Sequence, residues 1–182
     1  VYNTLQMYRH DRLDYLKKLH EDSKEKGYII GVKLVRGAYL EKENNRAKKM
    51  GYPTPIQPNK IACNQDYDMA LEYICKHIHG ISICAGTHNE ESSAFLVQLM
   101  KNNRIEKNNP KVHFAQLLGM SDHISYNLAN KGYNTVKYVP YGPVKDVLPY
   151  LIRRAEENTS IAGQTGRELS LIEQEIKRRK SN

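Results

Sequence analysis

The sequence predicts an α/β fold built from five parallel strands and the helices that connect them. Segments with strand and helix patterns alternate along the 182 residues, which is typical of parallel sheets with crossover helices. The predicted strand at 28–35 is almost continuously apolar, which indicates burial on both faces of such a sheet. Polar and aromatic residues recur just after the predicted strands, where α/β sheets and barrels bind their ligands.

The first half of the chain alternates predicted strands and helices, with Gly and Pro residues at several of their boundaries. The range 7–26 has Tyr8, Leu13, Leu16 and Leu19 at helical spacing among charges and ends before Gly27, so it is predicted as a helix. A second helix is expected at 40–50 and a Pro-rich connector at 51–58. The third predicted helix is 59–79, with an apolar side made of Ile61, Met69, Leu71, Tyr73, Ile74 and Ile78. The predicted strands of the whole chain are 1–6, 28–35, 81–86, 111–117 and 134–139.

The second half continues the same alternation and closes with two helices. A short helix is expected at 121–130, with Ser121 as its N-cap and Gly132 as its terminator. The last helix has an apolar stripe of Leu169, Leu171, Ile172 and Ile176. The other helices predicted in this half are 90–102, 143–158 and 168–180.

Composition narrows the class of protein. Hydrophobic residues make up 40% and charged residues 26%, which is typical of a soluble globular domain, and no apolar run approaches the roughly 18–20 residues that span a bilayer. Residues 1–6 show neither the basic region nor the cleavage site of a signal peptide, and the missing initial Met indicates a piece of a longer protein. The three cysteines, Cys63, Cys75 and Cys84, have no metal-ligand spacing and are expected to be buried free thiols in a reducing compartment.

The net charge of +8 leaves three kinds of partner open: nucleic acid, an anionic membrane surface or an anionic cofactor. Much of the basic excess lies at 177–180. Because no nucleic-acid-binding motif accompanies it, no nucleic-acid partner is expected, and a basic surface with a frayed tail explains the charge more simply.

Unusual side chains gather at the carboxyl ends of four predicted strands. Each has a plain structural explanation: Gly37 turns the chain, His88 packs against a backbone carbonyl, and Tyr138 covers the end of the sheet. Together they indicate a ligand site, since parallel strand ends meet at one rim. The residues at these ends are Lys33, Arg36, Gly37, Tyr39, Thr87, His88, Asn89, Gln116, Leu117 and Tyr138.

The helix predicted at 143–158 carries a second candidate group. Tyr150, Arg153, Arg154 and Glu157 are spaced so that they share one side of a helix. Two guanidinium groups on that side can bind a carboxylate, and the acid can hold one of them in place. Taken alone, the pattern is explained better by an exposed charged face than by a site.

Several other sites are excluded. The sequence contains no GxGxxG after a strand, no GxxxxGK[ST] and no GxSxG. His77 and His79 do not share a helix face and His88 has no ligand partner nearby, so no metal site is expected. No pair of neighbouring carboxylates suggests glycoside hydrolysis.

The motifs at the strand ends resemble those of FAD-dependent proline dehydrogenase. The resemblance covers nearly the whole chain and is closer to the monofunctional, mitochondrial-like branch than to the bifunctional bacterial proteins. It implies a (β/α)8 TIM-type barrel of which 1–182 is the C-terminal portion of one domain, incomplete with about five of eight units, with a terminal helix at 166–180. The motifs are KLVRGAY at 33–39, THN at 87–89, FAQLLGM at 114–120, KYVPYG at 137–142 and YLIRRAEEN at 150–158.

The resemblance implies an enzyme of proline catabolism that oxidises L-proline to Δ1-pyrroline-5-carboxylate by hydride transfer to FAD and passes the electrons to a quinone. The residues that match substrate contacts are the carboxylate clamp Arg153 and Arg154, the walls Tyr39, Leu117, Tyr138 and Tyr150, and the supporting acid Glu157. The residues that match cofactor contacts are Gln6, Lys33, Val35, Gly37, Ala38, Thr87, His88, Asn89, Gln116, Arg154 and Glu157. Tyr138 would crowd a 4-hydroxyl group, so proline is favoured over hydroxyproline.

The resemblance also sets expectations about location and partners. It implies a cytoplasmic protein in a bacterium, or one on the matrix side of the mitochondrion in a eukaryote, and it leaves peripheral membrane contact and homo-oligomerisation open. Two residues depart from the family pattern: Lys33 stands where many members have an arginine, and Cys63 stands near a common threonine.

Three further strand–helix units of the family, with a lysine and an aspartate that contact substrate, have no match in this chain. Five strands do not close an eight-stranded barrel. The alternatives are therefore a non-catalytic barrel fragment that associates with itself or with a missing N-terminal half and, more remotely, a basic nucleic-acid-binding module.

Overall fold

A computed structural model describes residues 1–160 and 164–180, and it describes the side chains of residues 1–154 and 169–180. The chain divides into two compact units, Val1–Tyr138 and Val139–Asn182. The first contains a five-stranded sheet with helices α1 to α5, and the second contains helices α6 and α7.

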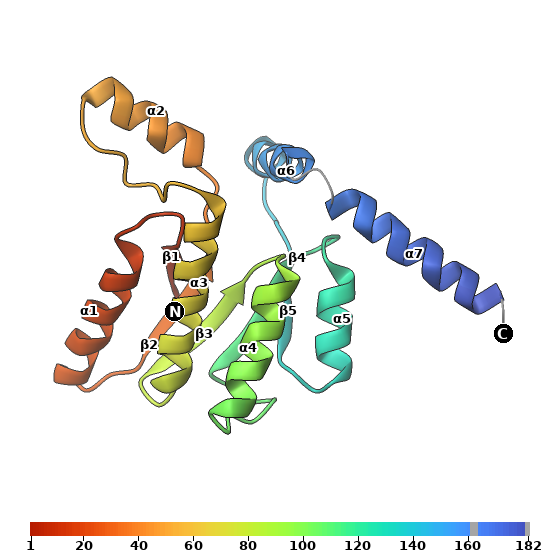
Figure 1. The fold of residues 1–182 in the computed structure, drawn as a ribbon, viewed down its shortest axis with the longest axis horizontal. Helices are drawn as coiled ribbons and strands as arrows, with labels where there is room; N and C mark the ends of the chain where they lie inside the picture. The colour runs from red at the N-terminus through yellow and green to blue at the C-terminus, as the bar shows by residue number, and fades with distance from the viewer. Residues whose placement is uncertain (161–163, 181–182) are drawn as a thin grey trace. The chain divides into compact units, whose positions relative to one another are not determined.

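The sheet confirms the predicted α/β fold with parallel strands. Its spatial order β1-β2-β3-β4-β5 is the same as the order in the sequence, and every neighbouring pair is parallel (Figure 1). A sheet wound in one direction like this is what part of a (β/α)8 barrel requires, whereas a doubly wound sheet would reverse its order at a switch point. The strands are β1 (Asn3–Gln6), β2 (Ile30–Val35), β3 (Ile81–Gly86), β4 (Val112–Leu117) and β5 (Thr135–Tyr138).

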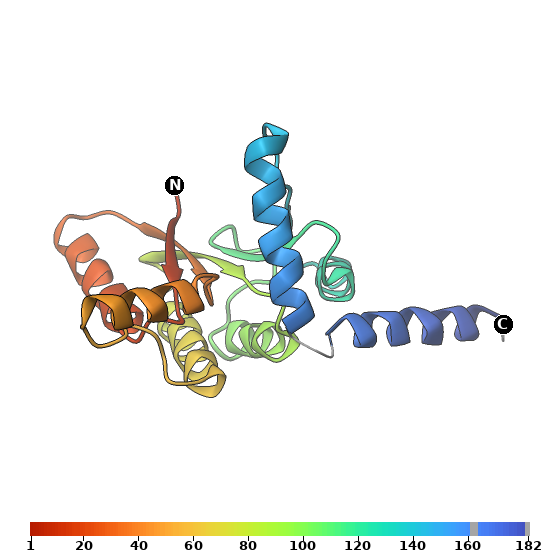
Figure 2. The same ribbon diagram turned by 90° about the horizontal axis from the view of Figure 1, so that it is seen from above.

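Four helices of the first unit cover one face of the sheet, as Figures 1 and 2 show. They are α1 (Arg12–Glu25), α3 (Lys60–Lys76), α4 (Glu90–Asn102) and α5 (Asp122–Asn130). The remaining helix of this unit, α2 (Leu40–Met50), buries only Ala47. In the second unit, α6 spans Val144–Ser160 and α7 spans Gln164–Lys180.

The hydrophobic core lies between the sheet and helices α1, α3, α4 and α5. In β2 and β3 every second residue is buried, and the residues between them are only half-buried. The prediction that 28–35 is a strand buried on both faces was therefore wrong in two ways: Tyr28 and Ile29 are exposed and precede the strand, and one face of β2 remains partly open. That half-buried face carries Lys33, which is one of the predicted site residues.

The first helix begins five residues later than predicted. Residues 7–11 are not helical, because backbone groups of this segment form hydrogen bonds with distant parts of the chain. Met7 and Tyr8 donate to the carbonyls of Val35 and Arg36, at 2.8 and 2.7 Å. Tyr8 also accepts from the amide of Gln57 at 2.7 Å. These tertiary bonds fix an extended turn where the sequence alone suggested a helical pattern.

The buried side of α3 was predicted correctly only in part. Ile61 and Met69 are exposed, with relative accessibilities of 68% and 45%. Leu71 and Ile74 are buried as expected. The helix ends at Lys76, because the chain turns back through His77–Gly80 to enter β3. The side that faces the core consists of Cys63, Tyr67, Ala70, Leu71, Ile74 and Cys75.

Local signals set several boundaries correctly. The ranges 40–50, 81–86 and 90–102 are confirmed as α2, β3 and α4. Gly51 ends α2 in a left-handed conformation, with φ of 73°. Ser121 does precede α5, but its backbone is left-handed and its hydroxyl does not cap the helix. Cys63 and Cys75 are buried free thiols as expected, whereas Cys84 is only half-buried.

A cluster of His20, Tyr73 and His77 connects the C-terminal half of α1 to the C-terminal end of α3. His20 is 2% exposed, its Nδ1 lies 2.9 Å from the hydroxyl of Tyr73, and its ring centroid lies 4.9 Å from that of His77. Burial lowers the pKa of His20 below its usual value near 6.5, and nearby Lys24 and His77 lower it further, whereas Glu21 raises it.

This cluster predicts acid sensitivity. The folded-state pKa of His20 lies below the unfolded value, so the unfolded chain binds more protons between the two pKa values. Stability should therefore decline as the pH falls below about 6.5. We expect His20→Gln to flatten this decline when the free energy of unfolding is measured in urea from pH 7.5 to 5.0. A variant with the same slope as the wild type would assign the acid sensitivity to another group.

Candidate functional site

The polar residues predicted from strand ends do meet at one edge of the first unit. This edge is formed by the carboxyl ends of β2 to β5 and the connections that follow them (Figure 1). It brings together Lys33, Arg36, Thr87, His88, Gln116 and Tyr138 through the contacts described below.

Arg36, directly after β2, is the most connected side chain of this edge. Its Nε donates to Asn64 Oδ1 at 2.8 Å, Nη1 to Thr87 Oγ1 at 2.7 Å and Nη2 to Ser92 Oγ at 2.9 Å. The guanidinium carbon also lies 4.4 Å from the centroid of the Tyr67 ring. Arg36 was predicted to lie at the strand end but without a role, because its acceptors lie 28 to 56 residues away in the sequence.

The turn Thr87–Asn89 connects β3 to α4 and holds itself in place. Thr87 Oγ1 accepts from the amide of Asn89 at 3.1 Å, and Asn89 Oδ1 accepts from the amide of Ser92 at 2.7 Å, which makes Asn89 the N-cap of α4. The side chain of Ser92 in turn donates to Asp68 Oδ1 at 2.7 Å. This spacing of an Asx residue and a helix start is visible in the sequence.

His88 projects from the same turn and contacts the β4–α5 connection. Its Nδ1 lies 2.9 Å from Ser121 Oγ. Ser121 is 1% exposed and has φ of 50°, a backbone conformation that a serine adopts rarely and that costs about 1–2 kcal/mol. The hydroxyl of the predicted N-cap serine thus contacts His88 instead of capping its own helix, a role that sequence reasoning missed.

Gln116 is buried in the sheet and is not a surface residue. It is 1% exposed, its Nε2 donates to the carbonyl of Thr87 at 3.1 Å, and its Oε1 accepts from Ser125 Oγ at 2.9 Å. Both ends of the amide are bound within the protein, so Gln116 braces the Thr87–Asn89 turn. A direct contact of Gln116 with a cofactor stays a prediction.

Lys33 reaches across the half-buried face of the sheet to Tyr138. Its Nζ lies 5.0 Å from the centroid of the Tyr138 ring, within the range of cation–π attraction. A methyl group on Gly86 would lie 3.4 Å from Lys33 Cε and 3.0 Å from Val35 Cγ1. The glycine therefore gives the lysine side chain and Val35 room on this face.

Gly37 and its neighbours form the β2 corner of the edge. Gly37 has φ of 117°, and a Cβ at this position would lie 1.5 Å from the ring of Tyr8. The Tyr8 hydroxyl donates to Gln6 Oε1 at 3.1 Å, and burial raises the pKa of that hydroxyl, with Glu43 adding to the effect. Ala38 is half-buried, and Tyr39 is 39% exposed at the start of α2.

Three acids of this edge bind neighbours other than Lys33 and Arg36, among them Asp68, which accepts from Ser92 Oγ at 2.7 Å. Glu90 Oε1 lies 2.9 Å from His123 Nε2, and Asp122 Oδ1 accepts from Lys137 Nζ at 2.5 Å, so both acids have a basic partner. Lys33 and Arg36 form no ion pair with a carboxylate among the described side chains. An anion is therefore the ligand that this donor set favours.

The second candidate group lies on α6, in the other unit. The guanidinium carbon of Arg154 lies 5.3 Å from the centroid of the Tyr150 ring, so these two side chains do share one side of the helix. Arg153 is half-buried, and its Nε is buried without a hydrogen-bond partner among the described residues. Glu157 lies outside the described side chains. The convergence of this helix on the strand ends stays a prediction, because α6 belongs to the second unit.

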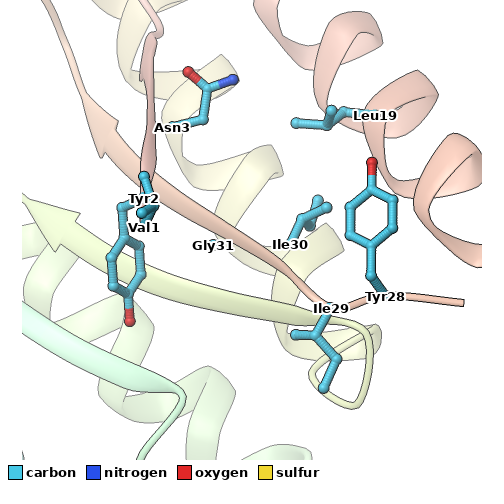
Figure 3. Close-up of a pocket in the computed structure, with 8 residues that line it drawn as sticks. All are labelled: Val1, Tyr2, Asn3, Leu19, Tyr28, Ile29, Ile30 and Gly31. Atoms are coloured by element: carbon cyan, nitrogen blue, oxygen red, sulfur yellow. The ribbon is translucent and has the colours of Figure 1, made fainter.

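A separate pocket of about 400 Å³ lies at the opposite ends of the strands. Figure 3 shows it between the first residues of the chain, Leu19 of α1 and the segment that enters β2. Tyr28 and Ile29, which line it, are exposed apolar residues. Its lining holds no titratable group apart from two tyrosines and the chain terminus, so this pocket does not suggest catalytic chemistry.

The described ranges contain neither a metal-binding cluster nor a membrane-spanning helix. No group of three or more His, Cys, Asp or Glu side chains there is placed to hold a metal ion. No helix among the described residues has the length and apolar character needed to cross a membrane.

Comparison with known proteins identifies the relatives of this chain. A family model described as Proline dehydrogenase matches residues 1–167. Human "Proline dehydrogenase 1, mitochondrial" is 42% identical over 182 residues, which cover 98% of this chain and 30% of the human protein. "Hydroxyproline dehydrogenase" of Xenopus laevis is 41% identical over an alignment of 186 positions, gaps included, which covers 100% of this chain and 40% of that protein. The chain thus spans less than half the length of these curated relatives.

Solved structures give the same result. The crystal structure of proline utilization A from Bdellovibrio bacteriovorus, inactivated by N-propargylglycine, superposes with a TM-score of 0.82 and 29% identity. The match covers 88% of this chain and 16% of that protein. A proline utilization A mutant from Bradyrhizobium japonicum, with a TM-score of 0.76 and 23% identity, supports the fold alone.

Proposed function

The chain belongs to the proline dehydrogenase family, and from this premise we propose that its protein oxidises L-proline to Δ1-pyrroline-5-carboxylate with FAD as cofactor. The observation that carries the proposal is the edge formed by four parallel strand ends, where Lys33 lies over the Tyr138 ring and Arg36 donates to Thr87. The described part of the chain forms five strands, and a closed eight-stranded barrel needs three more.

The residues of the edge fit FAD by their chemistry. The diphosphate of FAD is an anion, and Lys33 and Arg36 supply positive charge without a direct ion pair to a carboxylate among the described side chains. The amide and hydroxyl groups of the Thr87–Asn89 turn add hydrogen-bond donors. We propose that this turn contacts the diphosphate and adenosine, and that Gln6, Val35, Gly37 and Ala38 contact the flavin.

The reaction requires the substrate ring to be oriented. Oxidation removes a hydride from C5 of proline and a proton from the ring nitrogen, which leaves the C=N bond of the product. FAD, when bound, supplies the hydride acceptor. We propose that Arg153 and Arg154 bind the carboxylate while Tyr39, Leu117, Tyr138 and Tyr150 enclose the ring and exclude water, with Glu157 supporting the arginines. Fixing both ends of a small substrate in this way lowers the entropic part of the barrier.

The proposal is tested with the full-length protein. We expect a yellow protein with flavin absorbance whose colour is bleached by L-proline and which reduces a quinone analogue. A colourless protein that does not turn over proline would contradict the assignment.

A second candidate function, a non-catalytic barrel fragment, is favoured by the unpaired outer edges of β1 and β5 in the described sheet. Size-exclusion chromatography of the 182-residue chain would then give an oligomer without flavin.

The relatives leave the choice of ring substrate open, because proteins named for proline and for hydroxyproline match at nearly equal identity. We propose proline because the Tyr138 ring, held beside Lys33, would occupy the space of a 4-hydroxyl group.

Tyr138→Ser is expected to shift the ratio of kcat/KM for proline over trans-4-hydroxy-L-proline about tenfold toward hydroxyproline. Removing the ring opens space for the hydroxyl and loosens the pocket around proline, and differences of this size are usual for one group in a pocket. Steady-state kinetics with both substrates measure the shift. Tyr138→Phe keeps the ring and is the control. An unchanged ratio in Tyr138→Ser would exclude Tyr138 from the substrate wall.

We also propose that the electrons pass to a quinone, which is reached by peripheral contact with a membrane. The human relative is named as a mitochondrial protein. For a eukaryotic source we propose the matrix side of the mitochondrion, and for a bacterial source the cytoplasmic side of the inner membrane. A homo-oligomer remains compatible with the fold.

A further inference from the structure

Arg36 is a half-buried cation whose three hydrogen bonds connect three separate elements. Asn64 lies on α3, Thr87 in the turn after β3, and Ser92 in the first turn of α4. The guanidinium also stacks over the ring of Tyr67, which is completely buried. A lysine cannot reproduce this arrangement, because it has a single point of donation and no planar face to stack.

The charge of Arg36 is balanced indirectly. Ser92 Oγ accepts from Arg36 Nη2 at 2.9 Å and donates to Asp68 Oδ1 at 2.7 Å. The serine hydroxyl therefore separates the guanidinium from the nearest carboxylate of its network. Part of the positive charge stays available to a ligand at the strand ends.

The bond to Thr87 determines what the Thr87 hydroxyl can do. A hydroxyl has two acceptor sites and one hydrogen to donate. Thr87 Oγ1 accepts from Arg36 Nη1 at 2.7 Å and from the Asn89 amide at 3.1 Å, which uses both acceptor sites. Its own hydrogen is then left to be donated, and a donor bond from a charged group strengthens that donation.

We propose that Arg36 is a positioning residue of the dinucleotide site: it fixes the Thr87–Asn89 turn and restricts the Thr87 hydroxyl to donating toward a phosphate oxygen. This inference rests on the proposed function, since it takes FAD as the ligand. Arg36 itself is assigned no contact with the substrate. Its effect should therefore appear in the affinity for FAD and not in the recognition of proline.

The test is a double-mutant cycle in the full-length protein. Arg36→Met and Thr87→Val each remove one side of the bond at nearly constant volume. The dissociation constant for FAD is measured with deflavinated protein by the quenching of flavin fluorescence. Each single variant is expected to bind FAD about 10- to 100-fold more weakly, as is typical for hydrogen bonds that involve a charged group. The double variant is expected to be no weaker than the weaker single variant, because Arg36 acts through Thr87.

Two further variants make the cycle specific. Arg46→Met, on the exposed side of α2, removes a cation without touching the network and should leave the affinity for FAD unchanged. Arg36→Lys keeps the charge but should recover only part of the affinity. If Arg36→Met does not fold, as judged by circular dichroism, the cycle is run with Arg36→Lys.

The readouts separate positioning from general damage. At saturating FAD, Arg36→Met is expected to change the KM for proline less than about twofold, and amide hydrogen exchange at Asn89 should become faster. An unchanged dissociation constant for FAD, or losses that multiply in the double variant, would overturn the inference. Failure of the proposed function would show differently, as a wild-type protein that does not bind FAD at all.

Discussion

Arg153→Met is expected to raise the KM for proline by about 100-fold while the FAD content of the purified protein stays unchanged. Proline offers its carboxylate as the one permanent negative charge, and an arginine binds a carboxylate through two parallel hydrogen bonds. A 100-fold loss corresponds to about 2.8 kcal/mol. Removing one partner of a buried charge pair costs about 2–5 kcal/mol, so the expected loss lies within the usual range.

The geometry of α6 supports this expectation from within the helix. Arg154 lies over the ring of Tyr150 at 5.3 Å, which fixes the side of the helix that carries the proposed clamp. Arg153 is half-buried, and its Nε is buried without a partner among the described residues. A buried donor without a partner is costly, so a carboxylate ligand would relieve a cost that an exposed arginine would not have.

Two controls make the experiment specific for the carboxylate. Lys145→Met removes an exposed cation from the same helix and should leave the KM for proline unchanged. Pyrrolidine lacks the carboxylate, so any inhibition constant for it should differ little between the wild type and Arg153→Met. The clamp assignment fails if proline saturation is the same in Arg153→Met and the wild type, or if the variant has lost its FAD.

The strand–helix alternation and the parallel sheet were predictable because local patterns and topology agree. Gly51 ends α2, Asn89 caps α4, and the apolar runs of β3 and β4 lie where the sequence places them. A parallel sheet in sequence order follows from these elements, since each crossover helix returns the chain to the same end.

The errors arose where distant parts of the chain override a local pattern. The segment after β1 has a helical pattern, but its backbone is bound by β2 and by Gln57, so α1 starts only at Arg12. Ile61 and Met69 are apolar but lie outside the face of α3 that meets the sheet. Helical periodicity counts apolar residues and does not reveal which face the core will take.

The candidate site was predictable as a set of positions but not as a network. Strand ends located Thr87, His88 and Gln116, because topology alone brings strand ends together. The partners of these residues were not visible in the sequence: Ser121 turns toward His88 only through a rare backbone conformation, and Arg36 reaches acceptors on two other helices. Such contacts depend on rotamers and packing that no spacing rule encodes.

Gly37→Ala is expected to destabilise the protein by at least about 4 kcal/mol, the range of the most severe single substitutions. Two costs add at this position. The backbone has φ of 117°, where side chains other than hydrogen are strained, and the new Cβ would lie 1.5 Å from Cδ1 and 1.7 Å from Cε1 of Tyr8. Urea unfolding of the full-length protein measures the loss, with flavin content as a second signal.

The ring of Tyr8 cannot easily move aside. Tyr8 is 4% exposed, its amide donates to Arg36 at 2.7 Å, its carbonyl accepts from Gln57 at 2.7 Å, and its hydroxyl donates to Gln6 at 3.1 Å. Displacing it would disturb Gln6 and the backbone of Arg36, both at the proposed cofactor site. The substitution is therefore expected to reduce flavin binding as well as stability.

Two further variants divide the cost into its parts. Gly51→Ala also places an alanine at positive φ, 73°, but its Cβ would meet nothing within 4 Å, so it should cost only about 1 kcal/mol. In a Tyr8→Ala background the added methyl group at Gly37 no longer meets a ring, and Gly37→Ala should then cost little more than Gly51→Ala. Such coupling between two neighbouring positions is the signature of steric overlap. Equal costs of Gly37→Ala with and without the Tyr8 ring would show that backbone strain, and not Tyr8, is what requires glycine in this motif.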